Sequence, residues 1–157
     1  MLQWLTRIFG RKPKTVSTRD EVHFSEEGIY YLSWMSRSQQ WPTLWPWPVV
    51  LEFGLSFHQA IYPDPWFGNY MEAEWFFTVD HDGNPQRIFF DVDYFSIDEL
   101  PVILNEKLSG FDKAALKEGW KEYRAGLRNF KGEGQWPAWR NKDFVWPEYL
   151  APDTSET

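Results

Sequence analysis

Apolar and polar residues alternate with a period of two in three successive stretches of the chain, at about 49–58, 70–79 and 87–94. Side chains of a β-strand point alternately to its two faces, so each stretch predicts a strand with one apolar face. Residues 80–85, which read Asp-His-Asp-Gly-Asn-Pro, are typical of a hairpin turn between the second and third strands. We therefore predict a mainly antiparallel sheet of at least three strands.

A helical period follows the predicted sheet. Apolar residues recur at i, i+4, i+7, i+11 and i+14 in the set Leu116, Trp120, Tyr123, Leu127 and Phe130. Asp112 can cap this helix, and a shorter helix after Asp98 should end before Gly110. The stripe should cover the apolar face of the sheet, so the predicted fold class is α+β with helices on one face. We expect the core to include Trp75, Phe77, Phe90, Leu116 and Trp120.

For residues 20–40 we predict a further helix that starts near Ser25, because Glu26 and Glu27 would stand in its first turn, where the helix dipole favours acids. Its apolar stripe would be Ile29, Tyr30, Leu32, Trp34 and Met35. Three prolines forbid a helix in the Trp-rich segment at 41–48. We interpret this segment as an extended strap whose indole rings seal the core, with a sugar-stacking or proline-motif platform as the alternative. From Gly132 onward we expect an irregular segment with aromatic anchors.

The N-terminal residues 1–19 form a basic amphipathic arm or helix in this interpretation, followed by a single α+β domain at 20–151 and a frayed tail at 152–157. The arm should dock on its own domain or, through residues 1–14, weakly on an anionic membrane surface. The candidate membrane-contact residues are the apolar stripe and its cationic flank, namely Met1, Trp4, Leu5, Ile8, Arg11 and Lys12.

Composition narrows the class of protein. The chain has 157 residues and no cysteine, which excludes disulfides and thiol chemistry. Without a secretory apolar region, we expect a cytoplasmic location, with peripheral contact with the inner face of the membrane as an addition. Eleven Trp, thirteen Phe and seven Tyr make the expected core aromatic.

Charge is distributed unevenly, since residues 20–110 contain fifteen acidic and three basic side chains. If the apolar faces of the strands point into the core, an acidic surface with only Arg87 to offset it covers the opposite face. An acidic surface disfavours nucleic acid as a partner and favours a basic protein. The candidate partner-binding residues on this face are Glu52, His58, Glu72, Glu74, Asp91 and Asp93.

These patterns favour a small acidic cytosolic binding protein that neutralises a basic partner, with no cofactor. An inhibitor of a basic toxin enzyme such as a nuclease, as in bacterial immunity proteins, has these general properties. Two alternatives stay open: a metal-dependent hydrolase that uses the sheet carboxylates, and a peripheral-membrane adaptor that uses the N-terminal arm. The hydrolase would take its metal ligands from Glu52, His58, Glu72 and Glu74.

Overall fold

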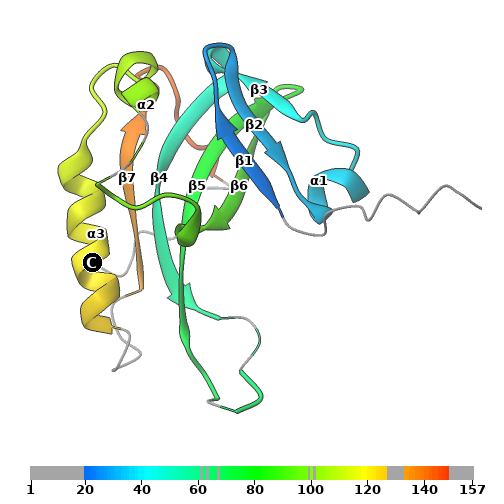
Figure 1. Ribbon diagram of the computed structural model, residues 1–157. Helices are drawn as coiled ribbons and strands as arrows, with labels where there is room; N and C mark the ends of the chain where they lie inside the picture. Colours follow the sequence, from blue (N-terminus) through cyan, green and yellow to red (C-terminus); the bar gives the residue numbers. More distant parts are fainter. Residues whose placement is uncertain are drawn as a thin grey trace, which may run out of the picture.

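The computed structural model describes residues 20–60, 62, 64–66, 68–98, 100, 102–126 and 133–148 (Figure 1). Within these residues the elements are β1 (Glu21–Phe24), β2 (Gly28–Leu32), α1 (Trp34–Ser38), β3 (Leu44–Pro46), the 3-10 helix η1 (Trp47–Val49), β4 (Val50–Gln59), β5 (Met71–His81), β6 (Asn84–Asp91), the 3-10 helix η2 (Val92–Tyr94), α2 (Val102–Lys107), α3 (Lys113–Gly126) and β7 (Gly134–Arg140). Two antiparallel sheets result, with strand orders β1-β2-β3 and β6-β5-β4-β7. The predicted α+β fold with a mainly antiparallel sheet is confirmed.

The predicted arm at 1–19 and tail at 152–157 lie outside the described residues, as do Leu127 and Phe130 of the helical stripe. The same holds for all the candidate membrane-contact residues, Met1, Trp4, Leu5, Ile8, Arg11 and Lys12.

The four-stranded sheet contains the three strands that the alternation predicts. A two-residue turn joins β5 to β6, and Asp82 and Gly83 both have positive φ, at 54° and 81°. This conformation matches the twist of a hairpin, which explains the Asp-Gly pair at this point of the sequence. The third strand ends earlier than predicted, because the chain turns into η2 directly after Asp91.

The fourth strand, β7, corrects the prediction of an irregular segment after Gly132. Residues Gly134–Arg140 pair with β4 although the strand contains Pro137. Proline cannot donate to a β-ladder, but β7 is an edge strand, and the register shifts opposite Gly54. A Cβ atom on Gly54 would lie 2.5 Å from the carbonyl oxygen of Trp136, so the close approach of the two strands requires glycine there.

The smaller sheet corrects the prediction of a helix starting near Ser25. Val22 and Ile29 point into the core from β1 and β2, while Glu26 and Glu27 form the turn between the strands and not a first helical turn. The stripe from Ile29 to Leu32 is therefore a strand, and only α1 is helical. The following segment is extended only as far as Pro46, and its Trp45 is buried in β3. Trp47–Val49 then forms η1, which corrects the prediction that the prolines forbid any helix at 41–48, because Pro48 stands in the first turn, where no intrahelical N–H bond is needed.

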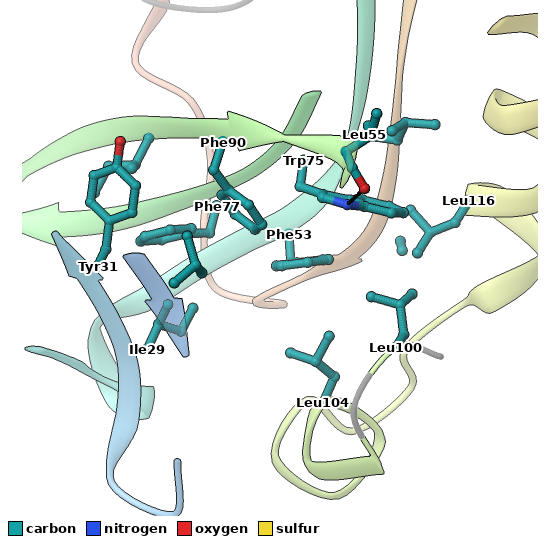
Figure 2. Packing of buried hydrophobic residues seen from close by; sticks show 14 of the residues in the cluster. Ile29, Tyr31, Phe53, Leu55, Trp75, Phe77, Phe90, Leu100, Leu104 and Leu116 are labelled. Atoms are coloured by element: carbon teal, nitrogen blue, oxygen red, sulfur yellow. Dashed lines mark hydrogen bonds between the residues drawn. The ribbon is translucent and has the colours of Figure 1, made fainter. Parts of the chain in front are cut away.

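The hydrophobic core lies between the two sheets and under the helices. Figure 2 shows side chains of the smaller sheet on one side of the large-sheet residues and leucines from the helical region on the other. The helices α2 and α3 thus cover only part of the core face, and the smaller sheet covers the rest (Figure 1). The core residues predicted from the sequence are buried, apart from the half-buried Trp120, which stacks on Trp75 at a centroid distance of 6.3 Å.

The edge strand β6 has several of its backbone groups blocked. Pro85 has no N–H to offer, and the side-chain amide of Gln86 donates to the carbonyl oxygen of Arg87 at 3.1 Å. The Tyr31 hydroxyl from the smaller sheet donates to the carbonyl oxygen of Phe89 at 3.2 Å. These contacts use hydrogen-bonding groups that an additional strand would need.

Candidate functional site

The predicted partner-binding residues belong mainly to the outer face of the four-stranded sheet, which is the face opposite the core. The register places His58 of β4 beside Glu72 of β5, and Glu74 of β5 beside Asp91 of β6. These four residues therefore come together at one end of the face. We call them the acidic end.

Glu52 also lies on the outer face, but the expectation that it is displayed to solvent is wrong. Its side chain is only 1% exposed and forms ion pairs with Arg87 of β6 and Arg140 of β7. The Arg140 Nε donates to Glu52 Oε1 at 2.8 Å. We call these three side chains the buried ion cluster. Arg87 is thus not the only base on this face, because β7 contributes a second arginine.

Further contacts hold Arg87 in the buried ion cluster. Its Nε donates to Thr78 Oγ1 at 3.2 Å and its Nη1 donates to Gln135 Oε1 at 2.6 Å. The guanidinium carbon lies 4.2 Å from the ring centroid of Phe76 and 4.8 Å from that of Trp146. Burial lowers the pKa of Arg87, and the charge of Glu52 opposes that effect. In this half of the outer face the charge of Glu52 is therefore fully compensated by arginines, and only Arg140 of the three side chains is largely exposed.

The acidic end differs because its carboxylates reach water. The side chains of Glu72 and Glu74 are 38% and 30% exposed, and Asp91 is exposed. His58 Nε2 lies 3.9 Å from Glu72 Oε2 and 3.8 Å from Glu74 Oε2. The hydroxyl of Tyr70 donates to Glu72 Oε1 at 2.7 Å, which fixes that carboxylate on one side. The arrangement presents adjacent negative charges from neighbouring strands.

Glu74 carries an electrostatic cost in the folded protein. Burial is the main cause that raises its pKa, and the neighbouring charges of Glu72 and Asp91 raise it further, while His58 lowers it. The folded state therefore disfavours the ionised carboxylate. Solubility alone does not explain Glu74, because another polar residue at this position would keep the face soluble without this loss of stability.

Asp93 lies beyond the end of β6, so the strand register does not assign it to the outer face as it does Asp91. It lies in η2, where its backbone N–H donates to Asp91 Oδ1 at 2.8 Å. Burial raises the pKa of Tyr123 on α3, and the charges of Asp93 and Asp91 add to this effect. Asp93 is exposed between the buried Val92 and the half-buried Tyr94, so the alternation of exposed and buried side chains continues beyond the end of the β6 ladder.

The four metal ligands of the hydrolase alternative are not brought together. Glu52 precedes His58 by six residues on the same strand, a separation of about 20 Å at the usual rise per residue. Within the described part of the chain, no group of three or more His, Asp or Glu side chains is arranged to hold a metal ion.

Sequence reasoning also missed a set of exposed aromatic side chains beside the acidic end. Tyr62, Trp66 and Tyr70 belong to the connection between β4 and β5. The one signal in the sequence is that this loop combines aromatic residues with Pro and Asp.

Among the helices that the structure describes, none is long and apolar enough to cross a bilayer. Comparison with protein-family models, with curated proteins and with solved structures found no match to this chain.

Proposed function

We propose that this protein binds a basic protein partner through the acidic end. The observation that carries the proposal is the placement of Glu72, Glu74 and Asp91 side by side on two neighbouring strands, within reach of solvent. Among the described residues, none of these carboxylates forms an ion pair with a lysine or an arginine. A basic partner would supply the missing countercharges.

The contrast with the buried ion cluster supports this proposal. On the same face, Glu52 is matched by two arginines, so the fold can neutralise a carboxylate where its own structure needs it. At the acidic end the raised pKa of Glu74 means that its ionised carboxylate lowers the stability of the folded state. Such costs are typical of residues selected for function.

An acidic protein that binds a basic enzyme acts by occupying the substrate-binding site of that enzyme. A negative patch accelerates association by electrostatic steering, and it can fill a basic cleft that otherwise binds a phosphate backbone. The proposed role is therefore an inhibitor, and an immunity protein against a basic toxin enzyme is the form of this role that we favour. Such a role needs shape and charge but no catalytic residues of its own.

The test is a kinetic comparison of two charge-reversal variants. A partner is first captured from the native cells with the tagged protein, identified and purified. Glu72→Lys combined with Glu74→Lys should slow association with it several-fold or more at low salt. The control, Glu106→Lys combined with Glu118→Lys, changes the net charge equally on exposed helix positions and should have a much smaller effect.

Raising the salt concentration should shrink the difference between the variants, because the Debye length falls to about 3 Å at 1 M. An equal loss of rate in both variants would show that net charge alone matters. Unchanged rates in the first variant would contradict the proposal.

A further inference from the structure

The connection between β4 and β5 exposes large aromatic side chains. Tyr62, Trp66 and Tyr70 are 80%, 84% and 39% exposed, and no other aromatic side chain of the described residues is as exposed as the first two. We call these three residues the aromatic tip. Figure 1 shows the β4–β5 hairpin extending past the end of β6. Exposed aromatic side chains lower solubility, so the strong exposure of Tyr62 and Trp66 needs an explanation.

Local hydrogen bonds order the backbone that carries Trp66. Asp64 and Gly68 form a bridge in which each backbone N–H donates to the other's carbonyl oxygen, at 2.7 and 2.9 Å. The N–H of Trp66 donates to Asp64 Oδ1 at 2.7 Å. A side chain that is presented on an ordered turn loses less entropy on binding than one on a loose loop.

The aromatic tip adjoins the acidic end directly. Tyr70 belongs to the tip, and its hydroxyl donates to Glu72 of the acidic end at 2.7 Å. Asp64, in the same connection as the aromatic tip, adds another carboxylate. We infer that the aromatic tip is the apolar anchor of the interface with a basic protein, with Trp66 entering an apolar pocket that basic residues surround. This inference rests on the proposed function and names the kind of surface that the partner offers.

The charges around the tip decide between this partner and two other occupants. Trp and Tyr also favour membrane interfaces, but membrane surfaces that recruit proteins electrostatically are anionic and would repel Asp64, Glu72 and Glu74. In a symmetric dimer of this chain the same patch would meet itself, so the carboxylates would face one another. A basic protein is the occupant whose charge complements both the tip and the acidic end. Aromatic anchors surrounded by polar groups are typical of the residues that dominate interface energies.

The test uses three synthetic peptides of equal length as probes. Lys alternates with Ser in the first, Phe replaces some of the Ser residues in the second, and the third contains Phe and Ser without Lys. Binding of each labelled peptide is measured by fluorescence anisotropy at low salt. The proteins are the wild type, Trp66→Ala, the Glu72→Lys/Glu74→Lys double variant, and the control Trp34→Ala, which removes a Trp that is 72% exposed on α1 of the other sheet region.

The wild type should bind the Lys–Phe peptide about ten-fold or more tightly than the Lys–Ser peptide. Trp66→Ala should lose that difference and keep the affinity for the Lys–Ser peptide, while Trp34→Ala should behave as the wild type. The double variant should bind both Lys-containing peptides more weakly. The melting temperatures of Trp66→Ala and Trp34→Ala should be unchanged, as expected for exposed positions, and a cooperative thermal transition will show that the double variant is folded.

Failure of the anchor and failure of the proposed function give different results. The role of Trp66 as an anchor is refuted if Trp66→Ala keeps the preference for the Lys–Phe peptide. It is also refuted if the wild type does not bind that peptide or has no preference for it. If charge reversal leaves binding of the Lys–Ser peptide unchanged, the proposed function is contradicted. Equal binding of the peptide without Lys refutes the basic character of the partner. Vesicle binding or dimerisation that Trp66→Ala abolishes would assign the tip to a membrane or to a second copy and overturn the inference.

Discussion

Glu52→Gln is the substitution that tests the buried ion cluster most directly. It removes the negative charge and keeps the size of a side chain that is 1% exposed. Arg87, whose side chain is 12% exposed, then stays buried without its counter-charge. At an effective dielectric constant of about 20, two charges about 4 Å apart attract by about 4 kcal/mol.

Removing one partner of a buried pair typically destabilises a protein by about 3–5 kcal/mol, and we expect Glu52→Gln to lie in this range. For a domain of this size that loss corresponds to a decrease in Tm of roughly 10 °C. Arg140→Gln should cost about 1 kcal/mol or less, because the Arg140 side chain is 48% exposed, so that solvent screens its ion pair with Glu52, and Arg87 still pairs with Glu52. Glu72→Gln makes the same chemical change at an exposed position and should stay within about 0.5 kcal/mol of the wild type.

Urea unfolding followed by tryptophan fluorescence and circular dichroism measures these differences, provided that the m-value is unchanged. The double variant Glu52→Leu/Arg87→Met should regain much of the stability that Glu52→Gln loses, since an apolar pair of similar volume carries no uncompensated charge. A free energy of unfolding for Glu52→Gln within about 1 kcal/mol of the wild type would refute the burial argument.

Two further predictions concern the core and the acidic end. Trp120→Ala should lower the free energy of unfolding by about 3 kcal/mol, because it removes a half-buried indole that stacks on Trp75 at an interplanar angle of 8°. A loss below about 1 kcal/mol in urea unfolding would show that α3 does not depend on this contact. The pKa of Glu74 is raised above 4.5 in the folded state, so the wild type should lose stability as the pH rises from 4.5 through that raised pKa. Glu74→Gln should therefore be more stable than the wild type at pH 7, and the two proteins should have equal free energies of unfolding at pH 3. Parallel stability curves of the two proteins between these pH values would contradict the origin given for the shift.

The sequence predicts those parts of the fold in which the local pattern and the long-range packing agree. In the strand containing Trp75 and Phe77 every second residue from Met71 to Val79 is apolar, and Asp82-Gly83 provides the required turn, so β5 and β6 could be predicted. Glu26 and Glu27 led to the wrong prediction of a helix starting near Ser25, because acids are common in a first helical turn and less common between two strands. Pro137 is not compatible with an interior strand, and only the whole topology shows that β7 lies at an edge, where proline is tolerated.

The candidate site was predictable to the extent that alternation determines the direction of a side chain. His58, Glu72 and Glu74 lie on the outer face as the period of two requires. The burial of Glu52 was not predictable, because it depends on Arg140, which is 88 residues away in the sequence and belongs to a strand that the pattern hides. Charge patterns show which residues are ionisable, whereas the partners that neutralise them are decided by topology.

The blocked edge of β6 also limits how this molecule can misassemble. Open strand edges are where sheets extend into fibrils, and Phe89 on β6 is 38% exposed, so an unprotected edge here would be a nucleus for aggregation. Gln86 and Tyr31 occupy carbonyl oxygens of this edge, and Pro85 offers no N–H. Along this edge the backbone therefore offers few free hydrogen-bonding groups to a strand of a neighbouring copy, although the sheet carries exposed aromatic side chains at one end.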